Sequence, residues 1–153
     1  MHVIDDSSLK LVNQVSKAYQ GLVVSIIITG SRMHGGGRDL DVAIIYDELA
    51  VSKKGRDSSS FEKELIEYVD EASRKLGFSG VKMEDKPATS SQVDLHILSL
   101  TSFWQLLEER NPYILSYLES GLAISDGGFF TTLQKIYDPG LMKPSKQAAL
   151  AYF

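Results

Sequence analysis

The sequence predicts a small domain of the α/β (α+β) class, in which a mixed β-sheet is flanked by helices. Three observations support this. Residues 22–29 form a nearly continuous β-branched run, which is typical of a strand buried on both faces. Residues 39–46 alternate between two kinds of side chain, as a second strand would. Segments with helical spacing precede and follow these strands, so that helices and strands interleave.

The first half of the chain gives the elements in a clear order. Residues 6–20 carry apolar side chains at near-helical spacing and predict an amphipathic helix before the two strands. Residues 47–60 are polar and small, which indicates a surface loop. Residues 61–76 repeat apolar positions at helical spacing and predict a longer helix that ends at Gly77.

The second half of the chain predicts both strands and helices. Residues 81–83 and 92–98 have the composition of two further strands separated by a loop. Two short helices are expected between residues 101 and 120, with Pro112 in a first turn, where its missing N–H costs little. Residues 128–153 predict one or two more helices, broken where prolines occur.

Length and composition indicate one domain. A chain of 153 residues with 43% hydrophobic residues suits a single hydrophobic core, and the sequence has neither an internal repeat nor a linker. We therefore assign residues 1–153 to one domain. It has a core of about residues 1–100 and a helical C-terminal extension of about residues 101–153.

Composition also excludes several classes of function. The sequence contains no cysteine, which excludes disulfides, thiolate metal sites and a cysteine nucleophile. The formal charge of −4 argues against broad, non-specific binding of nucleic acid. The N-terminus lacks the features of a secretory signal, and no apolar run approaches the roughly 20 residues that span a bilayer. We expect a cytoplasmic protein that does not enter a membrane.

Three aspartates predict a catalytic metal site. Alternation along a strand places Asp39 and Asp41 on the same face, where they repel each other unless a cation lies between them. Ligands that offer only oxygen suit Mg²⁺. Asp94, in a neighbouring strand, would add a third carboxylate for two ions roughly 3.5–4 Å apart. The sequence thus predicts a phosphoryl-transfer site with Asp39, Asp41 and Asp94 as catalytic residues and metal ligands.

The segment between the two strands predicts a binding site for phosphate. Gly30 permits a sharp turn that leaves backbone N–H groups free for a phosphate, and the hydroxyl of Ser31 adds a donor. Arg32 and Arg38 are candidate partners of a triphosphate, because a guanidinium pairs with two phosphate oxygens at once.

These residues carry a resemblance to a known family. Residues 28–35 (ITGSRMHG) and 38–45 (RDLDVAII) resemble the Gly-Ser to Asp-x-Asp signature of the minimal nucleotidyltransferases of the polymerase β superfamily. The resemblance extends over about residues 22–98. The segment between Ser31 and Asp39 is shorter than in many members of the family.

The resemblance implies a palm-like fold and two Mg²⁺ ions. It implies that Asp39 and Asp41 are metal ligands and that Gly30 and Ser31 contact the β- and γ-phosphates. It further implies that Asp94 is the third carboxylate, which helps to activate the acceptor hydroxyl.

The expected function is therefore Mg²⁺-dependent transfer of a nucleoside monophosphate from an NTP, with ATP the expected nucleotide, to an acceptor hydroxyl. The acceptor could be a protein, an RNA end or a small molecule. Nucleic acid is expected only in that role. The alternative is a nucleotide-binding or partner-binding module without turnover, such as the antitoxin-like half of a pair with a small helical protein. A homo-oligomer is also possible through four aromatic residues, namely Phe129, Phe130, Tyr152 and Phe153.

Other motifs have ordinary interpretations. The run of three glycines at residues 35–37 is either part of the phosphate site or a flexible turn, and it matches neither a Walker A loop nor a dinucleotide fingerprint. The spacing of His34 and His96 does not indicate a transition-metal site. We interpret four aromatic residues as core rather than as a base-stacking platform, namely Phe103, Trp104, Tyr113 and Tyr117.

Overall fold

The structure is a computed structural model that describes residues 4–29, 39–83 and 91–136. In chain order the elements are α1 (Asp6–Ala18), β1 (Val23–Thr29), β2 (Leu40–Tyr46), α2 (Glu48–Lys53), α3 (Ser58–Lys75), β3 (Val93–Ser99), α4 (Leu100–Glu108), α5 (Pro112–Ser120), β4 (Leu122–Ser125) and α6 (Phe129–Ile136). Within the described part of the chain, no helix combines the length and the apolar character needed to cross a bilayer.

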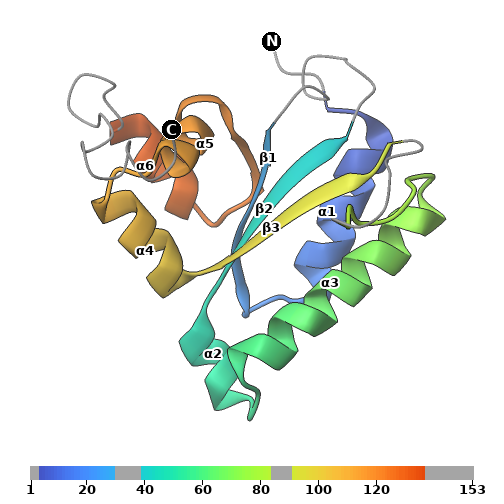
Figure 1. Cartoon of the computed structure of the whole chain (residues 1–153), viewed down its shortest axis with the longest axis horizontal. Helices are drawn as coiled ribbons and strands as arrows, with labels where there is room; N and C mark the ends of the chain where they lie inside the picture. The colour runs from blue at the N-terminus through green and yellow to red at the C-terminus, as the bar shows by residue number, and fades with distance from the viewer. Residues whose placement is uncertain (1–3, 30–38, 84–90, 137–153) are drawn as a thin grey trace.

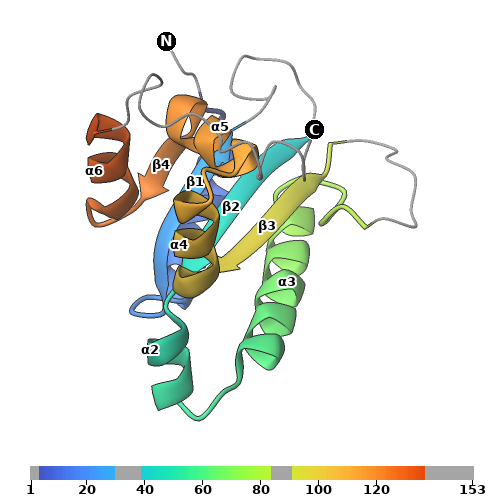
Figure 2. The ribbon, with the colours of Figure 1, turned by 60° about the vertical axis from the view of Figure 1, so that its left-hand side comes forward.

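The four strands form one mixed sheet in the order β3-β2-β1-β4. Figure 2 shows them side by side in this order, from β4 at the left to β3 at the right. Strand β1 pairs antiparallel with both β2 and β4, whereas β2 and β3 run parallel. A parallel pair needs a crossover, and the segment with α2 and α3 supplies it. The predicted class, a small mixed sheet flanked by helices, is confirmed.

Helices cover both faces of the sheet (Figure 1). Helices α1 and α3 lie on one face, and α4, α5 and α6 lie on the other. The period of two along β2 decides which side chain enters which core. Leu40, Val42 and Ile44 share one face, as expected from the alternation along this segment, and they pack in the core under α1 and α3. Ala43 and Ile45 point the other way and pack with residues of α4, α5 and α6.

One helix replaces a predicted loop. Residues 47–60 were expected to be a surface loop, but they contain α2 and the first residues of α3. The side chain of Asp47 caps this helix by accepting hydrogen bonds from the backbone nitrogens of Leu49 and Ala50 at 3.0 and 3.2 Å. Val51 is buried and fixes the helix to the core. Six residues are too few to show helical periodicity, which explains why the sequence pattern missed α2.

Two further predictions differ from the structure. Residues 81–83 were expected to form a strand, but in the structure Val81 makes an isolated parallel bridge to Val93. In contrast, β4 lies within the segment predicted as a helical extension, and it pairs with β1. The four residues of β4 carry little pattern of their own, so contact with β1 decides their conformation. The chain after residue 100 thus completes the sheet and covers its second face.

Asp126, which follows β4, connects β1 and α6 through hydrogen bonds. It accepts hydrogen bonds from the buried hydroxyl of Ser25 at 2.6 Å and from the backbone nitrogens of Phe130 and Thr131 at 2.7 and 2.9 Å. Burial raises the pKa of Asp126, but these hydrogen bonds outweigh it and hold the pKa below its ordinary value.

We expect Asp126→Ala to lower the free energy of unfolding by about 1 kcal/mol, because it removes a helix cap and leaves Ser25 without its acceptor. Urea denaturation at pH 7 measures this, with Asp6→Ala as the matched control at an exposed ion pair with Lys10. The loss should shrink as pH falls below 4, since the depressed pKa of Asp126 stabilises the fold only while the group is ionised. Equal stability of the two variants would contradict this role.

Candidate active site

Two of the three predicted aspartates lie directly opposite each other in the sheet. The parallel register of β2 and β3 pairs Asp41 with Asp94, and on the other side of β2 Thr29 pairs with Asp41. The acidic pair therefore lies where β2 and β3 begin and β1 ends. Alternation along β2 places Asp41 on the face of Ala43, which is covered by α4, α5 and α6.

The carboxyl groups of Asp41 and Asp94 interact strongly. The pKa of Asp41 is raised to about 6, first by burial, then by the charge of Asp94 and a hydrogen bond to its carboxyl group, and then by the charge of Asp39. Lys82 acts in the opposite direction. A hydrogen bond between two carboxyl groups requires a proton on one of them, so this pair resists carrying two negative charges at once.

Asp39 lies beside the pair but has partners of its own. Its Oδ1 accepts a hydrogen bond from the backbone nitrogen of Gln92 at 3.0 Å, and its Oδ2 lies 3.9 Å from Nζ of Lys82. Within residues 4–29, 39–83 and 91–136, no three acidic or imidazole side chains converge as a ready set of metal ligands. The structure thus joins Asp41 to Asp94 and holds Asp39 next to them.

Three further side chains surround the pair. Nε2 of His96 lies 3.4 Å from Oδ1 of Asp94, and the His96 ring meets the ring of Tyr113 edge to face at 5.2 Å. The hydroxyls of Tyr113 and Tyr117 are 3.0 Å apart. Sequence reasoning did not assign these residues to the site. The available signals were the position of His96, two residues after Asp94, and the four-residue spacing of the tyrosines.

Both tyrosines remain protonated at neutral pH. Burial raises the pKa of Tyr113 to about 12, and the nearby charges of Asp94 and Asp41 add to this effect. Burial also raises the pKa of Tyr117, again with contributions from both aspartates. The two phenols therefore act as hydrogen-bond donors and acceptors beside the acidic pair.

The predicted phosphate contacts lie outside the described residues, namely Gly30, Ser31, Arg32 and Arg38. They follow β1, whose last residue, Thr29, is paired with Asp41. Their assignment remains a prediction.

The predictions for the aromatic residues are confirmed only in part. Phe103 and Tyr117 are buried, as expected of core residues. Trp104 is 42% exposed and stacks on Phe103 at 5.7 Å, so it covers the core from outside.

Phe130 was predicted to belong to an association surface, but it is 1% exposed. The apolar face of α6 packs it inward, which corrects that prediction. Of the other residues proposed for that surface, Tyr152 and Phe153 lie outside the described part of the chain.

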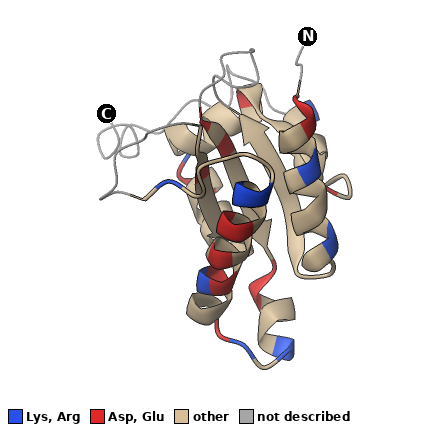
Figure 3. Cartoon of the chain, turned by 90° about the vertical axis from the view of Figure 1, so that its right-hand side faces the viewer, with Lys and Arg blue, Asp and Glu red and all other residues tan. Residues whose placement is uncertain are grey.

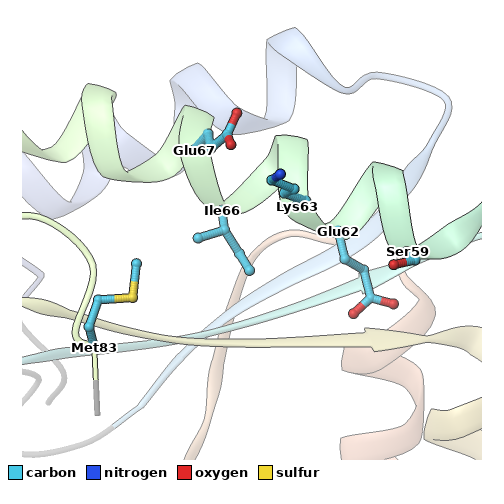
Figure 4. Close-up of a pocket in the computed structure, with 6 residues that line it drawn as sticks. All are labelled: Ser59, Glu62, Lys63, Ile66, Glu67 and Met83. Carbon is cyan, nitrogen blue, oxygen red and sulfur yellow. The ribbon is translucent and has the colours of Figure 1, made fainter. Parts of the chain in front are cut away.

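A surface pocket of about 570 Å³ lies against α3, and no residue of the acidic pair lines it. Figure 4 shows Ile66 and Met83 pointing toward each other across it, with the polar side chains of α3 around them. Glu62, which also lines it, already accepts a hydrogen bond from the hydroxyl of Tyr46 at 2.6 Å. The pocket offers no group of convergent donors that would indicate chemistry, and we do not place the active site there.

Comparison with known proteins identifies no family for this chain. No protein-family model matches the chain, and no curated protein matches it. Among solved structures, the chain is similar to the spectinomycin adenyltransferase AAD(9) from Enterococcus faecialis, crystallised with ATP and spectinomycin. The two are 14% identical with a TM-score of 0.44, over 90% of this chain and 58% of that one. The chain thus spans little more than half of that protein, and a likeness this slight carries no weight for function.

Proposed function

We propose that the protein is a nucleotidyltransferase that moves a nucleoside monophosphate from an NTP to an acceptor hydroxyl. The observation that supports this most is the in-register pair of Asp41 and Asp94, whose carboxyl groups meet beside Asp39 at the end of the sheet. The sequence resemblance to the polymerase β superfamily involves the same aspartates and the segment that follows Thr29.

The residues at this site fit Mg²⁺. Asp41 and Asp94 offer carboxylate oxygens from adjacent strands, and a divalent cation would relieve the repulsion that raises the pKa of Asp41. Asp39 is available as a third ligand, because its ion pair with Lys82 is long, at 3.9 Å, and partly exposed, and such pairs are weak. When bound, Mg²⁺ would orient the phosphates and neutralise the charge that develops on them during transfer.

The proposed reaction is a substitution at the α-phosphorus. The acceptor oxygen forms a bond to this phosphorus, and the bond to the oxygen that bridges the α- and β-phosphates breaks. Pyrophosphate leaves with the electron pair. We assign Asp94 to accept the hydrogen bond, and then the proton, of the acceptor hydroxyl. Gly30, Ser31, Arg32 and Arg38, which follow β1 in the sequence, would bind the triphosphate.

A nucleic acid chain is the acceptor that the charge distribution favours least. On the face shown in Figure 3, acidic residues occupy much of α3, and the basic residues are scattered among several elements. With a formal charge of −4 for the whole chain, this suits a small acceptor or a protein better than a long polyanion. A small helical protein remains our candidate for a protein acceptor or partner.

The first test uses ATP labelled at the α-phosphate, with Mg²⁺ and with glycerol and water as surrogate acceptors. We expect release of pyrophosphate and transfer of the label, and we expect EDTA to lower the rate by about 100-fold or more, since a bound cation supplies several kcal/mol of charge stabilisation. Addition of Mg²⁺ in excess over EDTA should restore the rate. Release of phosphate from the γ position, or transfer that continues unchanged in EDTA, would contradict the proposal.

The second candidate is a module that binds nucleotide or a partner without turnover. The observation in its favour is Asp39, whose two oxygens are directed to Gln92 and Lys82 rather than to the acidic pair. Isothermal calorimetry separates the two candidates. Binding of ATP that does not depend on Mg²⁺, together with absence of transfer, would favour the module.

A further inference from the structure

The start of α5 holds Tyr113 in a fixed position beside the acidic pair. Asn111, which is 1% exposed, caps the helix by accepting a hydrogen bond from the backbone nitrogen of Tyr113 at 2.8 Å. Pro112 occupies the first turn and restricts the backbone further. The ring of Tyr113 then rests against His96 of β3 and against Tyr117 of the next helical turn.

The pairing of the two phenols decides where the free hydroxyl hydrogen points. Each phenol carries one hydrogen, and their mutual hydrogen bond of 3.0 Å uses one of the two. Tyr117 is 3% exposed, and a buried donor without an acceptor costs about 1–3 kcal/mol. Tyr113 is only half-buried. The stable arrangement is therefore donation from Tyr117 to Tyr113, which leaves the hydrogen of Tyr113 for a ligand at the site.

The hydroxyl of Tyr113 lies near the proposed base, because the charges of Asp94 and Asp41 both act on it. His96 contacts both Asp94 and the ring of Tyr113, so His96 links Tyr113 to Asp94. Asp94 accepts a hydrogen bond, whereas Tyr113 donates one. A molecule that matches both carries its reacting hydroxyl beside a second oxygen or nitrogen with a lone pair.

We propose that Tyr113 donates a hydrogen bond to the acceptor substrate, and that His96 and Tyr113 form the wall of the acceptor subsite. The acceptor class that fits is a diol, a sugar or an amino alcohol rather than a simple alcohol. This inference rests on the proposed transferase function and specifies its acceptor side.

The test compares two surrogate acceptors, glycerol and 1-propanol, with α-labelled ATP and Mg²⁺. The wild-type protein should prefer glycerol. Tyr113→Phe should lower the ratio of the rate with glycerol to the rate with 1-propanol by about five- to tenfold, because the loss of one hydrogen bond of about 1 kcal/mol corresponds to a change of this size. Hydrolysis, in which water is the acceptor, should change much less. Tyr117→Phe should lower the ratio less, because the hydroxyl of Tyr113 remains but loses the donor that directs it.

The matched control is Tyr68→Phe. The hydroxyl of Tyr68 reaches the backbone oxygen of Gln14 at 3.4 Å, on the other side of the sheet, and its loss should leave the ratio unchanged. A thermal melt of Tyr113→Phe close to that of the wild type separates substrate contact from a structural role. If the wild type transfers label and Tyr113→Phe keeps the wild-type ratio, this inference is wrong while the transferase function stands. If the wild type transfers no label to any of the three acceptors, the transferase function itself fails, and the inference fails with it.

Discussion

Replacing Asp41 with asparagine is expected to lower transfer from α-labelled ATP by about 1,000-fold or more. Asp41 lies opposite Asp94 and is influenced by the charges of both Asp94 and Asp39, so its carboxylate contributes to the negative charge of the site. An amide removes that charge and is a poor ligand for Mg²⁺. Loss of several kcal/mol of charge stabilisation in the transition state corresponds to this factor, at 1.36 kcal/mol for each tenfold change.

The matched control for this substitution is Asp6→Asn in α1. Asp6 is 79% exposed and pairs with Lys10 on the helix surface, so the same chemical change there should leave the transfer rate at the wild-type level. Circular dichroism shows whether both variants are folded. Asp39→Asn should also reduce transfer strongly, because Asp39 is the third proposed ligand. Wild-type rates in both Asp41→Asn and Asp39→Asn would remove these residues from the mechanism.

The same acidic pair is expected to make the metal-free protein less stable as pH rises. The pKa of Asp41 is raised from 3.8 to about 6 in the folded state, so between these values the folded protein binds more protons than the unfolded chain. The free energy of unfolding should therefore fall through this range. A shift of this size corresponds to about 3 kcal/mol, which solvent screening of a partly exposed group reduces to about 1–2 kcal/mol.

Urea denaturation in EDTA at pH 4, 5, 6 and 7 measures this effect by comparing the wild type with Asp41→Asn. The variant cannot ionise at this position, so it should gain about 1–2 kcal/mol relative to the wild type between pH 4 and pH 7. Mg²⁺ at pH 7 should then raise the melting temperature of the wild type and have little effect on the variant. A constant difference between the two proteins across the pH range would show that Asp41 does not titrate as described.

Active sites often hold like charges close together at a cost in the stability of the fold. In this protein, the two hydrophobic cores offset the cost of the acidic pair. Large apolar side chains such as Ile26, Phe61 and Phe103 are almost completely buried, in cores on both faces of the sheet. The electrostatic repulsion at Asp41 therefore lies at one end of a sheet that is otherwise packed on both sides.

Much of the fold could be predicted from local pattern. The β-branched run gave β1, and the alternation in the next strand assigned Leu40, Val42 and Ile44 to one face, as the structure confirms. Helical spacing gave α1 and α3, and Pro112 was placed correctly in the first turn of a helix. These predictions succeeded because side-chain direction repeats with a fixed period within one element, so neighbouring residues suffice to determine it.

Other features required contacts between distant segments. The four residues of β4 form a strand because they pair with β1, and α2 forms because Val51 is buried and Asp47 caps it. Neither segment is long enough to carry a periodic signal of its own. The engagement of Asp39 by Gln92 and Lys82 could not be predicted either, because it joins residues far apart in the chain.

The sequence by itself determined the strand that carries Asp41, and it predicted a site of Asp39 and Asp41 on one face of that strand with Asp94 in another strand. In the structure this strand begins at Leu40, directly after Asp39. Only the tertiary structure decided that Asp41 lies opposite Asp94, and that α5 brings Tyr113 to their side. The physical reason is that strand register and helix docking are fixed by the packing of two cores, which depends on the whole chain. A local pattern specifies the direction of a side chain but not the neighbour that it meets.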